Sequence, residues 1–240
     1  MTAENISKLE HPIDVMPLMH KAFRAKSGRT EALAAQASTI EDIAELNEAF
    51  GLWVKQILYH ATVEDEVMTA PLQNSQPARD NEAEHAVLAG KAGELASLIA
   101  RGKTARLEDS AREAAFTLEE KQHKELGERS HEVEEALKEA LGEKKVTART
   151  IRHIHSQLLG VRVLELDHFE NEEAFVCSLV RDEIDEAGQL YMVRRLLMDD
   201  TADDPRWIID WVRSELDSAE QAQLDELENR FKGAVAQLGY

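Results

Sequence analysis

Two stretches of the sequence, LYHATVEDEVM (residues 58–68) and LDHFENEEAFV (residues 166–176), carry the same pattern of a histidine followed four residues later by a glutamate. The pairs are His60 with Glu64 and His168 with Glu172. A spacing of four residues rises about 6 Å and turns about 400° along an α-helix, so both side chains project from one face. On such a face the imidazole can hold one metal ion while the carboxylate reaches a second. The pattern therefore predicts helices that carry metal ligands.

The spacing alone is not informative, and the surrounding residues decide which pairs matter. Three such pairs occur, close to what chance gives in a chain with nine histidines and 47 acidic residues. The pairs in residues 58–68 and 166–176 interrupt apolar stripes, so we expect them to face the core. The third pair, His131 with Glu135, has charged neighbours and is expected to face solvent. Unpaired buried charge is unfavourable, and a metal ion would compensate it.

Two further histidines indicate an internal repeat. Between His20 and His60 we expect one helix that leads away from the first histidine and a second that returns to the same level. The same arrangement is expected between His85 and His168. This arrangement predicts two antiparallel helical hairpins with their histidines at matching heights. The four histidines and two glutamates would then converge inside a four-helix bundle, a common place for metal sites.

The composition favours long helices. The chain of 240 residues has only 11 Gly and 5 Pro, and its 43% of hydrophobic residues can build a core. We expect an all-α fold, an up-down four-helix bundle, rather than a β-sandwich or barrel. Hydrophobic periodicity places the bundle helices at about residues 13–37, 39–70, 79–102 and 147–180. Thr39 with Asp42 forms a capping-box-like start for the second of them, and Thr147 is the expected N-cap of the fourth.

Two regions are expected outside these four helices. Residues 103–145 are highly charged, with apolar residues mostly three, four or seven positions apart, and we expect them to form a helical insertion at the tip away from the histidines. Near the C-terminus, Trp207 and Trp211 lie on one side of a helix and are expected to pack onto the body. We therefore expect a metal-binding bundle over residues 1–200 and a C-terminal helix over 201–240 packed on it.

On these histidines and glutamates, the chain resembles the hemerythrin-like proteins, or HHE cation-binding domains, over roughly residues 13–180. Members of this family hold a non-haem di-iron centre in a four-helix bundle, with carboxylates that bridge the irons. The resemblance implies that Glu64 and Glu172 bridge two iron ions. It also implies four terminal ligands: His20, His60, His85 and His168. Iron suits this mixture of imidazole and carboxylate, and manganese or zinc is less expected.

The sequence departs from the oxygen-carrying hemerythrins, which have five histidines. Asn81 and Ala89 stand one turn from His85, where a second histidine would be, and Glu172 replaces an aspartate five residues after the last histidine. The fifth ligand is therefore water, another acid such as Glu82, or a histidine from the insertion. An open coordination position favours reactivity or sensing over simple reversible carriage.

We therefore expect a di-iron protein that reacts with or senses oxygen, peroxide or nitric oxide. Two alternatives remain: a di-iron oxidase or oxygenase acting on a small organic substrate, and a metal-free helical interaction protein. A ferritin-like carboxylate site with pairs such as Glu165 and His168 ranks lower, because it leaves His20 and His60 unexplained. His123 is a minor candidate for an extra ligand.

Charge and cysteine content narrow the range of partners. The net charge of −19 repels phosphate backbones and anionic lipid, so we expect neither nucleic acid nor a membrane as partner. The lone Cys177 excludes a disulfide framework, and neither a secretory signal nor a membrane span is seen, which favours the cytoplasm. A small diatomic ligand such as O2 or NO is the expected partner, and a homo-oligomer is compatible with the sequence.

Overall fold

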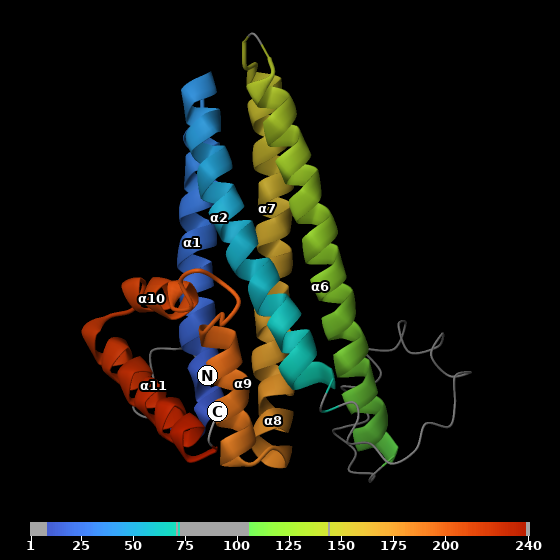
Figure 1. The fold of residues 1–240 in the computed structure, drawn as a ribbon. Coiled ribbons are helices and arrows are strands. Elements are labelled where there is room, and N and C mark those ends of the chain that lie inside the picture. The colour runs from blue at the N-terminus through green and yellow to red at the C-terminus, as the bar shows by residue number, and fades with distance from the viewer. Residues whose placement is uncertain (1–8, 71, 73–105, 144, 239–240) are drawn as a thin grey trace.

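The computed structural model describes residues 9–70, 72, 106–143 and 145–238, and the regular elements within these ranges are all helical. The four longest bundle elements are α1 (Met16–Gln36), α2 (Ile40–Glu64), α6 (Arg106–Leu141) and α7 (Ala148–Asn171). They lie side by side (Figure 1), and each contacts the next in the order α1, α2, α6, α7 and back to α1. The expected all-α fold is confirmed.

Shorter elements precede, extend and cover this bundle. They are η2 (Pro12–Val15), η3 (Asp65–Thr69), η4 (Glu172–Val176), α8 (Cys177–Glu183), α9 (Glu186–Leu197), α10 (Trp207–Ser214) and α11 (Ser218–Leu238). The π-helices η3 and η4 directly continue α2 and α7. Helix α9 packs against η2, α11 against α9, and α10 against α1, so the C-terminal helices lie beside the lower half of α1 in Figure 1. None of the described helices is long and apolar enough to cross a membrane.

The helix starts that the sequence indicates are present. The Thr39 hydroxyl accepts from the Asp42 amide at 3.1 Å, and the Asp42 carboxylate accepts from the Thr39 amide at 2.9 Å, so the capping box is complete. Thr147 caps α7 by accepting from the amide of Thr150 at 3.2 Å. These caps fix where the returning helices begin and therefore the height at which their far ends lie.

The position of α6 corrects the sequence prediction for residues 103–145. Instead of forming an insertion away from the histidines, α6 packs along α2 and α7. Leu126, Val133 and Leu137 are fully buried and belong to the same core cluster as Trp53. The strongly charged outer face of α6 led to the wrong prediction, because only one narrow stripe of a bundle helix needs to be apolar. The third helix predicted at 79–102, with His85, lies outside the described residues.

Candidate metal centre

The two histidine–glutamate pairs lie at the same level, at the C-terminal ends of α2 and α7. His60 and Glu64 are 1% exposed, and His168 and Glu172 are fully buried. His20 on α1 is also fully buried. Apolar core residues lie above and below this level, so the polar groups are enclosed in the bundle.

Both glutamates stand at the junction of an α-helix with a π-helix. Helix α2 ends at Glu64 and η3 follows, whereas η4 begins at Glu172 directly after α7. Single π-helical turns inside α-helices are rare and are found frequently at functional sites. The two stretches that share a sequence pattern therefore also share an unusual backbone conformation.

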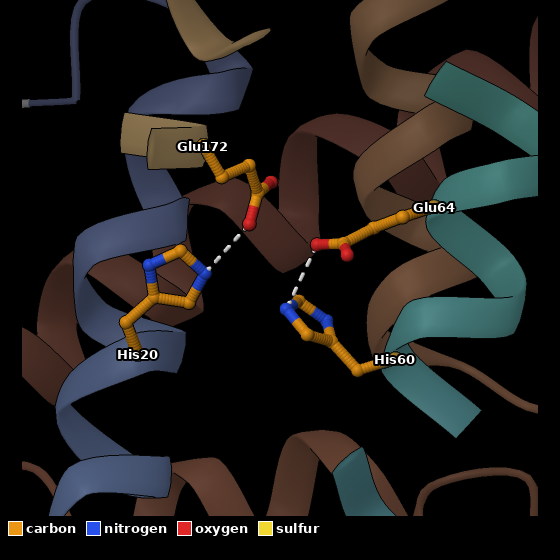
Figure 2. Close-up of side chains that lie close together, drawn as sticks. All are labelled: His20, His60, Glu64 and Glu172. Atoms are coloured by element: carbon orange, nitrogen blue, oxygen red, sulfur yellow. Dashed lines mark ion pairs between the residues drawn. The ribbon is translucent and has the colours of Figure 1, made fainter. Parts of the chain in front are cut away.

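A first group of possible metal ligands consists of His20, His60, Glu64 and Glu172. One ligand atom from each lies within 4.8 Å of the others. The Nε2 atom of His20 is 3.1 Å from Glu172, and that of His60 is 2.8 Å from Glu64. Figure 2 shows these four side chains pointing toward one another from α1, α2 and η4. Such an arrangement is suited to hold one cation.

A second group consists of Glu64, Glu119, His123 and His168, again with ligand atoms within 4.8 Å of one another. Nδ1 of His168 lies 3.2 Å from Glu119, and Nε2 of His123 lies 3.3 Å from the second oxygen of Glu64. Glu64 is the member that the two groups share. Its two oxygens face different groups, which is the geometry of a carboxylate that bridges two metal ions.

The donor atoms are better placed to bind a metal ion than to form hydrogen bonds with one another. Nε2 of all four histidines and both oxygens of Glu64 and Glu172 are buried without a hydrogen bond. Although several of these atoms approach at ion-pair distance, they face each other without the geometry of a hydrogen bond. Buried polar atoms are normally satisfied, and lone pairs aimed at a common point are satisfied by a cation.

Two further carboxylates hold histidine rings in place from outside. Glu173 lies 2.7 Å from Nδ1 of His20 and also accepts from Arg24 at 3.0 Å. Asp65 lies 2.9 Å from Nδ1 of His123. A carboxylate on Nδ1 fixes the tautomer and leaves Nε2 free to bind a metal. In both cases the acid directly follows a glutamate of the centre, and it reaches the histidine of a neighbouring helix.

The pKa values show which groups carry charge when protons alone balance the centre: Glu119 and Glu64 raise the pKa of His168 to about 10, despite its burial. Burial and the neighbouring Glu64 raise the pKa of Glu172 to about 8, despite the attraction of His20. Burial also opposes the charge on Glu64, but His60, His123 and His168 hold its pKa well below the usual value. Two carboxylates so close together cannot both ionise without positive charge between them. A bound cation would supply that charge in place of protons on the histidines.

The structure brings together five of the six ligands expected from the sequence. These are His20, His60, Glu64, His168 and Glu172. His85 and the alternative ligand Glu82 lie outside the described residues. The third histidine–glutamate pair is at the surface, as expected: the side chain of His131 is 73% exposed, and that of Glu135 is 50% exposed.

Two members of the second group, Glu119 and His123, came from the segment expected to lie outside the bundle. His123 was weighed only as an extra ligand, and Glu119 was missed. The sequence does contain the same spacing in the opposite order, with Glu119 four residues before His123. The order is reversed because α6 runs antiparallel to α2 and α7. Glu165 belongs to neither group; it accepts from the Trp53 indole at 2.6 Å, contrary to a ferritin-like role.

Comparison with known proteins covers one part of this centre. The family model of the hemerythrin HHE cation-binding domain matches residues 11–121, a range that includes His20, His60, Glu64 and Glu119. This part of the chain is therefore similar to the hemerythrin HHE cation-binding domain family, the family that its histidines and glutamates resemble. No curated protein and no solved structure gives a significant match. The chain thus carries a cation-binding domain with two clusters of His and Glu suited to metal.

Proposed function

We propose that the chain binds two iron ions, one in each group, and that this di-iron centre reacts with or senses oxygen, peroxide or nitric oxide. The observation that carries the proposal is Glu64, whose two oxygens serve both groups. The centre would combine His20, His60 and Glu172 on one ion with Glu119, His123 and His168 on the other. Imidazole and carboxylate together suit iron, with manganese and zinc as competitors.

Each candidate ligand, and each acid that contacts a ligand, would have a definable task in this function. Glu64 would offer one carboxylate oxygen to each group, and the remaining ligands would hold the ions in the core. Glu173 and Asp65 keep the rings of His20 and His123 oriented. When bound, the iron pair would supply one-electron redox chemistry and a coordination position for a small ligand.

The surroundings of the first group would limit access of water. His20 stacks on Phe169 with ring centroids 4.0 Å apart, and Phe23 packs against His60 at 4.9 Å. An oxidase for organic substrates would need an apolar cavity beside the metal ions. A surface hollow lined by Asn47 and Phe50 lies about 15 Å or more from His60 along α2, too far for this role. The rings packed around His20 and His60 favour the small-ligand function, which is the one we propose.

Anaerobic loading with Fe(II), followed by removal of excess metal and elemental analysis, tests the metal content. We expect two irons per chain. Oxygen or nitric oxide is then added while the near-ultraviolet and visible absorbance is followed. A reversible change would indicate carriage or sensing, and a change that decays with turnover would indicate an enzyme. No bound iron after iron-replete loading would overturn the proposal and favour a metal-free interaction protein.

A further inference from the structure

A series of aromatic rings leads from the first group to the outer helix α10. Phe23 is fully buried, and its ring centroid lies 4.9 Å from that of His60. On its other side, Phe23 meets Trp211 edge-on at 4.8 Å. Trp211 belongs to α10 and is partly exposed. Three rings in contact thus connect a candidate metal ligand with the protein surface.

The same rings also reach the second histidine of the first group. Phe23 contacts Phe169 at 5.5 Å, and Phe169 stacks on His20 with an interplanar angle of 11°. Phe23 is therefore the common neighbour of His60, Phe169 and Trp211. Aromatic rings in direct contact give strong electronic coupling, which is what electron tunnelling requires.

We propose that Trp211 is an electron donor to the metal centre, with Phe23 as the bridge. This inference rests on the proposed di-iron function. Hydrogen peroxide takes up two electrons and two protons to become two molecules of water. When the iron pair can give only one electron, Trp211 gives the other. The indole Nε1 proton then passes to solvent and leaves a neutral indolyl radical. An external small-molecule thiol returns one electron and one proton to this radical and becomes a thiyl radical, and two thiyl radicals combine to a disulfide.

The surroundings of the three tryptophans single out Trp211. The ring of Trp207, on the same helix, contacts Tyr59 instead of Phe23, with the Lys55 ammonium 4.1 Å above it and its indole N–H donating to Asp199 at 3.0 Å. Trp53 is fully buried, so an external reductant cannot reach it. Trp211 combines contact with the centre through Phe23 and access from outside.

Such a relay would protect oxidisable side chains beside the centre. Met16 and Met19 are buried on α1 within four residues of His20, Met68 is buried one turn after Glu64, and Cys177 is buried in the same core cluster. Oxidation of methionine or cysteine converts an apolar core side chain into a polar one and disrupts packing. When Trp211 gives the electron, the oxidised side chain is a partly exposed one that an external thiol can reduce.

The test compares the iron-loaded protein with the zinc-loaded protein, because zinc is redox-inactive. Both forms are exposed to hydrogen peroxide without thiol, and oxidised tryptophans are mapped by mass spectrometry of the digested chain. We expect several-fold more oxidation of Trp211 in the iron form than in the zinc form, with Trp207 equal in both. Equal oxidation of Trp211 in the two forms, or preferential oxidation of Trp53, would overturn the relay.

A matched pair of variants tests the bridge. Phe23→Leu removes the ring between His60 and Trp211, whereas Phe50→Leu removes an equally buried ring that packs on Trp53. We expect Phe23→Leu to suppress the iron-dependent oxidation of Trp211 and Phe50→Leu to preserve it. If Phe23→Leu does not fold, the comparison of iron and zinc in the unmodified chain still decides.

Iron content separates this inference from the proposed function. A chain that binds no iron contradicts the proposed function, and the relay with it. A chain that holds two irons, changes its absorbance with peroxide and leaves Trp211 unmodified contradicts the relay alone.

Discussion

The ends of α2 and α7 are nearly alike in sequence and backbone but differ in their neighbours. Each brings a histidine, a glutamate four residues later and a second acid, and each continues into a π-helix. Glu64 nevertheless belongs to both groups of possible ligands, whereas Glu172 belongs only to the first. Burial and Glu64 raise the pKa of Glu172, whereas three histidines lower that of Glu64. A repeated local motif therefore takes two different roles, set by the helices packed against it.

The neighbouring histidines explain this difference. Glu64 lies 3.3 Å from Nε2 of His123 on α6 and 3.6 Å from His168 on α7, in addition to its own partner on α2. Glu172 lies 3.1 Å from His20 on α1 and 4.0 Å from His168. The resemblance to the family implied that both glutamates bridge the metal ions. The contacts make Glu64 the stronger candidate for this role.

Replacement of Glu64 with alanine is expected to have the largest effect. Loss of the shared carboxylate removes a ligand from both groups and leaves buried positive charge unbalanced. We expect the iron content to fall from two per chain to at most one weakly held ion, measured by elemental analysis after anaerobic loading and desalting. Retention of two irons in Glu64→Ala would show that the site assignment is wrong.

Replacement of Glu172 with alanine is expected to have a smaller effect. The four ligands of the second group remain, so we expect one firmly bound iron per chain by the same analysis. Glu119→Ala provides the matched variant in the other group and should also leave one. If Glu172→Ala loses both irons, Glu172 bridges as well, and the two ends of the helices are more alike than their contacts indicate.

Replacement of the outer acids should weaken binding without changing the number of ions. Asp65→Asn and Glu173→Gln alter the hydrogen bonds to Nδ1 of His123 and His20 but keep the side-chain size. We expect metal affinity to fall about tenfold to hundredfold, measured by competition with a chelator, with two irons at saturation. The control is Glu66→Gln. Glu66 lies in the same turn as Asp65, but its carboxylate pairs with Arg195 at 2.9 Å. An unchanged metal affinity in both variants would show that Asp65 and Glu173 do not orient the histidine ligands.

Replacement of the exposed pair should have no effect on iron. His131→Ala and Glu135→Ala keep the centre intact, because His131 faces solvent and Glu135 contacts Lys138 at 3.4 Å. We expect two irons per chain and unchanged affinity in both variants. A loss of iron here would mean that spacing, rather than burial, determines the site.

The sequence by itself determined the helices, their caps and the faces that carry His20, His60, Glu64, His168 and Glu172. These are local properties, since periodicity and capping depend on residues within a few turns of one another. Family resemblance then supplied the kind of site.

Only the tertiary structure decided which helix completes the centre. Glu119 and His123 lie on a helix whose charged surface hides a narrow buried stripe, and their order is reversed because that helix runs antiparallel to α2 and α7. The sharing of Glu64 and the contact of Trp211 with Phe23 likewise join segments far apart in the chain. Sequence patterns report which face of a helix is buried, but the packing of helices against one another determines which partner that face meets.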